Sequence, residues 1–447
     1  MTEKNSLINQ FEQVKDRVTK VLELADSLGA DGAEVAMSRT QGLSVGTRLG
    51  EVENVEFTND GALGITVYQG GRKGSASTAD LSESALKKTV QAAVNIAKYT
   101  SVDDCSGLAD KQLLSMDPPD LDLYHPKDLS TQEAIELAKA CENEALAFDK
   151  RITNSDGASL DSFEGFKVYG NSHGQLVGYP SSRHSMSCVA IASDGDEMQR
   201  DYAYSVNRDF DLLDSGTSIG RKAANEVISR LNAQKLPTSK VPVMFRSDIA
   251  NTIFGHLIAA ISGGNLYRKS SFLMDSLGQQ IFPSFLSIEE KPYLKKALAS
   301  SAFDSEGVKT QDRSIITGGE LDTYLLTSYS ARKLGLTTTG HAGGIHNWLV
   351  SANGGDFEAM LKKLGTGLLV TELMGQGVNV LTGDYSRGAA GFWVENGEIA
   401  YPVSEITISG TLQNIFKGLV AVGSDVDMHG SIRTGSIIIE EMQVAGN

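Results

Sequence analysis

The order of the predicted elements constrains the fold of this chain more than any single motif does, because one order occurs twice in the N-terminal half. Residues 7–29 carry apolar side chains at intervals of three and four, which predicts an amphipathic helix with one buried stripe. In the strand-rich sequence that follows, residues 63–68 alternate apolar and polar side chains and lead to a glycine-pair turn. The predicted elements are a helix at 7–29, strands between 34 and 78, a helix at 82–99, a helix from 130 to 148, strands between 151 and 205, and a helix at 217–233. We therefore predict two related helix–meander–helix units, residues 1–100 and 130–235.

Similar short sequences lie in both strand-rich stretches, TNDGA at 58–62 and TNSDGA at 153–158. They agree with a repeat. Asn, Asp and Gly are also the residues that turns use, so a chance match of two turns explains the similarity equally well. Between the units, Pro118, Pro119 and Pro126 disfavour helix, and residues 101–129 are predicted to be a linker.

A second region, residues 236–447, follows the two units. It is predicted to contain a helix at 247–262 and then becomes rich in glycine and in strand-like sequence. Asn396-Gly397 separates two apolar runs, which is a strong signal for a two-residue hairpin. Glycine-rich strands suit a sheet that curves on itself. The predicted fold class is α+β, with an N-terminal region at 1–235 and a strand-rich, barrel-like C-terminal domain.

Charge and composition exclude several functional classes. The chain has 40 Lys and Arg against 56 Asp and Glu, a net charge of −16, and it has no long basic run. Clustered cations dominate nucleic-acid affinity, so nucleic-acid binding is disfavoured. The three cysteines, Cys105, Cys141 and Cys188, suggest a reducing compartment. No apolar run approaches the roughly 18–20 residues of a membrane span. We therefore expect a cytoplasmic protein that does not bind membranes.

Histidines are the first candidates for a metal site. The seven histidines form no His-Glu-x-x-His pattern, which is the usual zinc-binding helix. His341 and His346 stand five residues apart in a glycine-rich loop and could reach one ion if a carboxylate or thiolate completed the site. Alternatively, both rings hydrogen-bond to backbone or line a pocket. The sequence alone identifies no third ligand.

Longer stretches carry more information than these short patterns. They are residues 340–348, 370–377, 382–391 and 392–403 in the C-terminal part, with 51–68, 254–257 and 267–271 upstream. Together they resemble the PmbA/TldD family over nearly the whole chain, and they are most similar to its PmbA branch, also called TldE. In that family a TldD-type subunit carries zinc on a His-Glu-x-x-x-His helix, and a late cysteine completes the site.

The resemblance implies that this chain lacks the zinc ligands of the family. The first His of the motif falls on Gly255, the Glu on His256 and the second His on Ala260. The late cysteine corresponds to Thr434, and no cysteine follows Cys188. Glycine, alanine and threonine cannot replace those ligands, and an imidazole cannot act as the carboxylate base. We therefore expect no catalytic residue, metal or cofactor of that kind in this chain.

The function that the resemblance implies is that of one subunit in a zinc metalloprotease. Zinc-dependent hydrolysis needs a metal that acidifies water and polarises the scissile carbonyl. The zinc would therefore come from a TldD-type partner, while this chain encloses an unfolded or flexible peptide. A peptide could bind by adding a strand to an exposed sheet edge. Our candidates for substrate contact are His341, His346, Tyr329 and Arg387. Packing or local hydrogen bonding explains each of them equally well.

Two other functions stay open at this point. The chain could be a self-sufficient metallopeptidase with its metal at His341 and His346. It could also be a non-catalytic, peptide-binding homodimer that acts as an adaptor. Metal analysis separates the first alternative from the subunit hypothesis. Peptide affinity without cleavage, even beside a TldD-type partner, separates the second.

Overall fold

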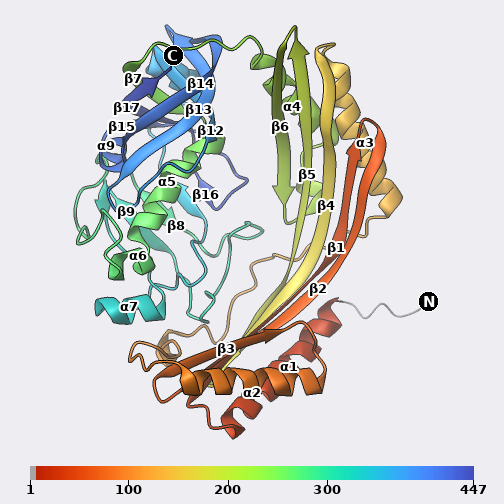
Figure 1. The fold of residues 1–447 in the computed structure, drawn as a ribbon, viewed down its shortest axis with the longest axis vertical. Coiled ribbons are helices and arrows are strands. Elements are labelled where there is room, and N and C mark those ends of the chain that lie inside the picture. The colour runs from red at the N-terminus through yellow and green to blue at the C-terminus, as the bar shows by residue number, and fades with distance from the viewer. Residues whose placement is uncertain (1–6, 447) are drawn as a thin grey trace.

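In the computed structural model, which describes residues 7–446, one long antiparallel sheet forms the N-terminal half (Figure 1). Its strand order is β3-β2-β1-β4-β5-β6. The strands are β1 (Gly32–Arg48), β2 (Glu51–Gln69), β3 (Arg72–Thr78), β4 (Ile152–Asn171), β5 (Leu176–Asp194) and β6 (Glu197–Asn207). Strands β1 and β4 pair antiparallel from Glu34↔Asn171 to Thr47↔Ala158. Each meander therefore contributes three strands, and the two meanders join at the centre of one sheet.

Two helices pack against each half of this sheet. They are α1 (Leu7–Ser27) and α2 (Glu83–Tyr99) on the first meander, and α3 (Thr131–Phe148) and α4 (Gly216–Ser229) on the second. All four predicted helices are thus present, and the order helix–meander–helix occurs twice. Helix α3 begins with a capping box, in which Ser130 and Glu133 each accept the other's backbone N–H. No helix in the described part of the chain is long and apolar enough to cross a membrane.

The structure supports neither explanation considered above for the two similar short sequences. Residues 58–62 lie inside β2 and residues 153–158 lie inside β4, so neither forms a turn. Strand β2 is the middle strand of its meander, whereas β4 is the first strand of the second meander. The match therefore does not mark equivalent positions in a repeat. Residues 101–129 contain one short 3-10 turn, Lys111–Leu113, and otherwise form the irregular connection that the prolines predict.

A closed five-stranded barrel forms the C-terminal part. The strand order is β14-β13-β12-β7-β17-β15, and an additional pairing of β14 with β17 closes five of these strands. The strands are β7 (Ser239–Phe245), β12 (Gly367–Met374), β13 (Asp384–Glu395), β14 (Glu398–Thr411), β15 (Leu419–Val422) and β17 (Ile437–Ala445). Asn396 and Gly397 form the β13–β14 turn with φ of 52° and 80°, as the hairpin signal predicts. The α+β class and the barrel-like sheet are therefore confirmed.

A smaller sheet packs in the same hydrophobic core as the barrel. Its order is β10-β9-β8-β11-β16. The strands are β8 (Ile288–Glu290), β9 (Arg313–Thr317), β10 (Glu320–Leu321), β11 (Trp348–Val350) and β16 (Ile432–Arg433). The remaining helices are α5 (Ser247–Ile261), α6 (Gly263–Tyr267), α7 (Ser328–Leu334), α8 (Phe357–Leu364) and α9 (Leu412–Lys417). Figure 1 shows the curved N-terminal sheet standing beside this C-terminal part.

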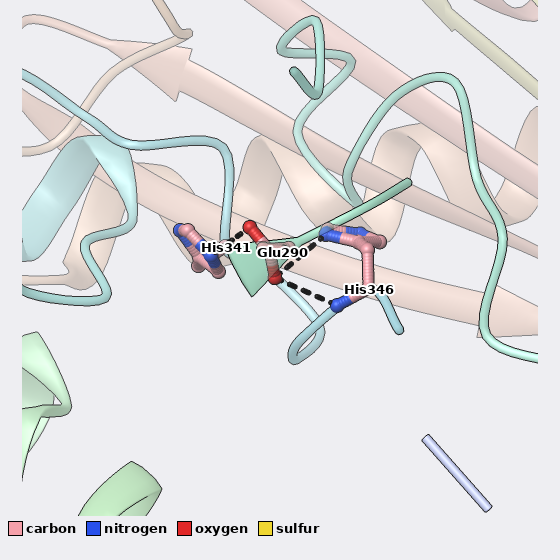
Figure 2. A group of neighbouring side chains, drawn as sticks. All are labelled: Glu290, His341 and His346. Atoms are coloured by element: carbon pink, nitrogen blue, oxygen red, sulfur yellow. Dashed lines mark hydrogen bonds and ion pairs between the residues drawn. The ribbon is translucent and has the colours of Figure 1, made fainter. Parts of the chain in front are cut away.

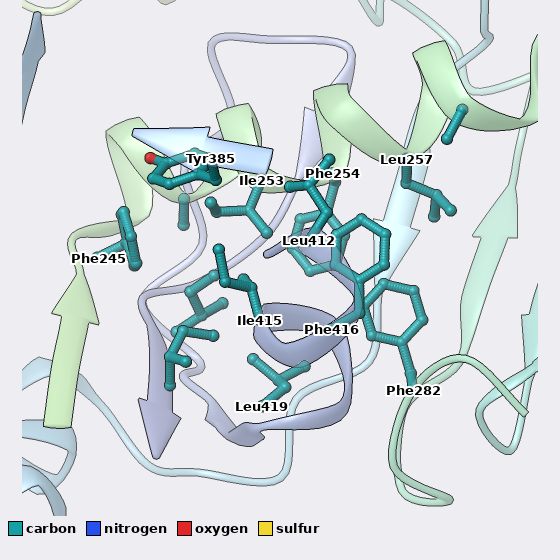
Figure 3. Close-up of a cluster of buried hydrophobic side chains, with 14 of the residues drawn as sticks. Phe245, Ile253, Phe254, Leu257, Phe282, Tyr385, Leu412, Ile415, Phe416 and Leu419 are labelled. Atoms are coloured by element: carbon teal, nitrogen blue, oxygen red, sulfur yellow. The ribbon is translucent and has the colours of Figure 1, made fainter. Parts of the chain in front are cut away.

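Helix α5 packs into the largest hydrophobic core of the chain (Figure 3). Its apolar face presents Ile253, Phe254 and Leu257, each at most 2% exposed. Phe416 of α9 stacks on Phe282 with ring centroids 4.7 Å apart. Burying several large side chains of this kind stabilises an element by about 1.5–3 kcal/mol for each one. The packing therefore fixes α5, and with it the residues of the predicted metal position.

Candidate functional site

Glu290, His341 and His346 form one buried cluster (Figure 2). Glu290 ends β8, and both histidines lie in the loop between α7 and β11. Nε2 of His341 is 2.8 Å from Oε2 of Glu290, and Nδ1 of His346 is 3.6 Å from Oε1. The backbone N–H of His346 also donates to Oε1, at 2.8 Å. The side chains of Glu290 and His341 are 2% exposed and that of His346 is 9% exposed. One carboxylate is thus held between two imidazoles, away from bulk water.

The two histidines decide the charge of Glu290. Burial by itself raises the pKa of this carboxyl group, but the contacts with His341 and His346 outweigh burial and lower the pKa to about 2. Glu290 is therefore ionised at neutral pH in spite of its burial. Because β8 carries the carboxylate and the loop carries both rings, this electrostatic contact attaches the loop to the small sheet.

Local geometry explains why the loop that carries both histidines is rich in glycine. Gly343 and Gly344 have φ of 105° and 126°, a conformation that residues with a Cβ rarely adopt. Nδ1 of His341 pairs with Oγ1 of Thr339 at 2.8 Å, which fixes the orientation of that ring. The centroids of the His341 and His346 rings are 5.9 Å apart. The glycines therefore allow the sharp path that brings the two rings to one carboxylate.

Sequence analysis misses Glu290, because it precedes His341 by 51 residues and no local pattern connects the two. The available signal is weak: strand β8 buries Ile288 and Glu290 and exposes Glu289, so an acidic residue occupies an inward position. The three donor atoms of Glu290, His341 and His346 lie within 4.8 Å of one another. Two imidazoles and a carboxylate are donors that zinc accepts. The carboxylate that a metal at the two histidines would require is therefore present.

A cavity of about 610 Å³ lies between the N-terminal sheet and the loops of the C-terminal part. Its wall contains residues of β1 to β4 on one side and residues 298–305 and 342–346 on the other. His346 reaches this wall, as does Asp304, whose pKa burial raises to about 7. The volume lies within the range of known ligand pockets, about 300–1,000 Å³. The Glu290 cluster thus borders the cavity through one of its histidines.

The position that the resemblance assigns to zinc holds no ligand set in this chain. Gly255, His256 and Ala260 lie on α5, and the side chain of Ala260 is fully buried. Thr434 is also buried, and its hydroxyl donates to the carbonyl of Gly435 at 3.0 Å. A zinc site needs three or four N, O or S donors around one point, and here His256 alone offers one. These residues do not fit zinc, so no hydrolytic step follows from α5 of this chain.

His256 instead lies beside Tyr385 and Arg387 of β13. The His256 and Tyr385 rings are nearly perpendicular, with centroids 5.8 Å apart. Burial, and then the charge of Arg387, lower the pKa of His256 to about 4. Burial raises the pKa of Tyr385 to about 12, although Arg387 opposes this rise. At neutral pH the group therefore consists of a neutral imidazole, a neutral phenol and one cation.

Tyr329 lies apart from both the Glu290 cluster and the His256 group. Its hydroxyl donates to Oδ2 of Asp103 at 2.7 Å, and Nζ of Lys333 donates to Oδ1 at 2.9 Å. These contacts join α7 to the linker between the two N-terminal units. The four candidates for substrate contact therefore do not form one group. His341 and His346 share Glu290, whereas Arg387 and Tyr329 have other neighbours, and a role for any of them in substrate binding stays a prediction.

Comparison with known proteins adds a family to this geometry. Three family models, described as PmbA/TldA metallopeptidase domain 1, central domain and C-terminal domain, match residues 33–97, 124–231 and 238–446. "Metalloprotease PmbA" of Escherichia coli is 58% identical over 98% of this chain and 97% of its own length. A "Metalloprotease PmbA homolog" of Haemophilus influenzae is 57% identical over the same shares.

A third relative and a solved structure complete the comparison. Haemophilus influenzae also has a "Metalloprotease TldD homolog", which is 20% identical over 95% of this chain and 92% of its own length. A crystal structure from Bacteroides thetaiotaomicron, of a protein named as a candidate modulator of DNA gyrase, superposes with a TM-score of 0.92 at 29% identity. The alignment covers 97% of this chain and 99% of that one. The chain therefore belongs to the PmbA/TldD family of metallopeptidases.

Proposed function

We propose that this chain is the subunit without zinc in a cytoplasmic metalloprotease complex that cleaves unfolded or flexible peptides. A TldD-type partner supplies the zinc, and this chain helps to enclose the substrate. The observation that carries the proposal is the replaced ligand set on α5, where Gly255 and Ala260 offer no donor atom. Without ligands there, the α5 position of this chain can neither acidify a water molecule nor polarise a peptide carbonyl through a metal.

Two features support a role in holding a peptide. The cavity of about 610 Å³ offers a partly polar space, open on one side to solvent, between the N-terminal sheet and the C-terminal loops. In addition, residues 51–62 of β2 pair with β1 on one side, while β3 covers only residues 63–69 on the other side in the described part of the chain. A free strand edge of this kind can pair with an extended peptide through backbone hydrogen bonds, with little demand on its sequence.

The proposed partner is supported by the pair of relatives in Haemophilus influenzae. That organism contains both a close relative of this chain, 57% identical, and a distant one, 20% identical, that is named after TldD. Two such chains in one organism agree with a complex of unlike subunits. A homodimer of this chain in the absence of the partner is compatible with the proposal, provided that the homodimer does not cleave peptides.

The experiment that tests the proposal measures peptide cleavage by three samples: this chain alone, a TldD-type partner alone, and their mixture. Each receives zinc and a flexible, labelled peptide. We expect cleavage by the mixture to exceed the sum of the separate samples and to stop when a chelator is added. A partner variant without its zinc-binding histidines serves as the control. Rapid, chelator-sensitive cleavage by this chain alone would falsify the proposal.

Glu290 favours one second candidate function, a metallopeptidase that needs no partner. With His341 and His346 it completes a two-histidine, one-carboxylate donor set, which some catalytic zinc sites use. Burial argues against hydrolysis there, since the side chains are 2–9% exposed and leave little room for a scissile carbonyl. Near-stoichiometric zinc in the purified chain, lost in the His341→Ala/His346→Ala double variant, would support this candidate. Peptide affinity without cleavage, even beside the partner, would instead support an adaptor homodimer.

A further inference from the structure

Three neighbouring polar groups on α5 and β13 lack a hydrogen bond of ordinary geometry among the described residues, although Arg387 stands close enough to Tyr385 to lower the pKa of its hydroxyl. They are Nε2 of His256, the hydroxyl of Tyr385 and Nε of Arg387, and all three atoms are buried. Tyr385 as a whole is only 1% exposed. Buried polar groups in folded proteins are nearly always hydrogen-bonded, because leaving water without a new partner is costly. Three such groups at one place therefore indicate a site that takes up polar groups from outside the chain, water or a ligand.

The chemistry of the three groups defines that partner. A phenol hydroxyl and a guanidinium N–H donate hydrogen bonds, and Nε2 of a neutral imidazole also donates when it carries the proton of the ring. Arg387 has no carboxylate within ion-pair distance in the described part of the chain, whereas Arg230 and Arg246 each pair with two. Three donors, one of them charged, match an acceptor that carries negative charge.

We propose that His256, Tyr385 and Arg387 bind a carboxylate group of the peptide substrate. This assignment rests on the proposed function, because it takes the ligand of the chain to be a peptide. The resemblance assigns the zinc of a TldD-type subunit to this part of α5, so the proposal gives one of the replaced residues, His256, a binding role. A Cβ added at Gly255, one residue before His256 on α5, would meet no atom within 4 Å, so the helix surface next to His256 is not filled by another segment. His256 and Arg387 are both partly exposed, which leaves the site open to a ligand.

The arrangement predicts opposite effects on stability and on binding for one small substitution. Tyr385→Phe removes only the hydroxyl that lacks a partner. We expect the midpoint of thermal unfolding to stay the same or to rise, because an unsatisfied buried group is lost. Affinity for a carboxylate falls about 3- to 10-fold, since one donor to the ligand is also lost. A hydroxyl with a merely structural role would not separate the two measurements in this way.

Binding to the purified full-length chain is measured with three labelled, flexible Gly/Ser/Ala peptides. The first ends in a free carboxylate, the second is the same peptide with a C-terminal amide, and the third is the amide with one internal Glu. The first and third peptides distinguish a terminal carboxylate from a side-chain carboxylate. We expect at least one of them to bind about 10- to 100-fold more tightly than the plain amide, and Arg387→Gln to abolish this preference.

The matched control is Arg183→Gln, which removes the same charge from an exposed position on β5. It should leave the preference for the carboxylate peptides intact. Equal affinity for all three peptides overturns the inference, as does a preference that survives Arg387→Gln. Loss of thermal stability in Tyr385→Phe also overturns it, because the hydroxyl would then have a partner within the chain. Since no cleavage is measured, failure here leaves the partner-dependent hydrolysis test unaffected.

Discussion

Replacing Glu290 by Gln removes the carboxylate that faces both His341 and His346 while keeping the shape of the side chain. Glu290 has its pKa lowered from 4.5 to about 2, a difference that corresponds to about 3 kcal/mol of folding free energy at neutral pH. Its side chain is 2% exposed, so solvent screens this contribution little. We therefore expect Glu290→Gln to lower the free energy of unfolding by about 3 kcal/mol at pH 7.

The pH dependence of this loss has a defined sign. Because the folded-state pKa lies below the unfolded one, the unfolded chain takes up the proton first as the pH falls. The stabilisation by Glu290 is complete above about pH 4.5 and disappears as the pH approaches about 2. The difference between the native chain and the variant should therefore shrink below about pH 4.5, as Glu290 becomes protonated.

Urea unfolding followed by tryptophan fluorescence measures this difference. Trp348 is fully buried and pairs directly with Glu290 across β11 and β8, so in a Trp393→Phe background it reports on the right place. The matched control is Glu289→Gln, whose side chain is 55% exposed and pairs with Lys291 at 3.1 Å. That change should cost less than about 1 kcal/mol. A loss below about 1 kcal/mol for Glu290→Gln at pH 7, or a loss unchanged down to pH 3, would refute the reasoning.

Three further predictions concern residues of helices α5 and α3. Gly255→His should leave the free energy of unfolding nearly unchanged, because a Cβ at this position meets no atom within 4 Å. Ala260→His should lower the free energy of unfolding by about 1–3 kcal/mol or more, because Ala260 is fully buried. The midpoints of urea unfolding of the two variants test this difference. Glu142→Ala should lower the free energy of unfolding by about 3 kcal/mol or more, because the buried side chain of Glu142 accepts hydrogen bonds from the backbone N–H groups of Leu49 and Gly50 in the β1–β2 turn, at 2.7 and 3.2 Å. Equal midpoints of urea unfolding for the variant and the native chain would contradict this. His256 has its pKa lowered from 6.5 to about 4, so its contribution to stability is complete above about pH 6.5 and is lost as the pH falls through 6.5 toward 4. His256→Asn should remove that part of the pH dependence, and identical unfolding profiles of the two proteins between pH 4 and 7 would disprove it.

Local sequence was sufficient for the elements whose causes are local. The helix over residues 7–29, the capping box at Ser130 and the turn at Asn396-Gly397 all appear where the pattern places them. Helical periodicity, capping and positive φ depend on residues only a few positions apart, so the sequence displays them directly. The family and the α+β class with a barrel-like sheet also followed from the sequence, because several long, ordered motifs resemble one family.

Contacts between distant segments were beyond the reach of these local patterns. The pairing of β1 with β4 merges the two meanders into one sheet, and no motif announces it. Glu290 joins His341 across 51 residues, and Tyr385 of β13 meets His256 of helix α5. Burial and hydrogen-bond partners are properties of the packed chain, since they depend on which surfaces the fold brings together. The sequence therefore determined the elements and the family. The packed structure alone determined the carboxylate between the histidines and the three donors without partners.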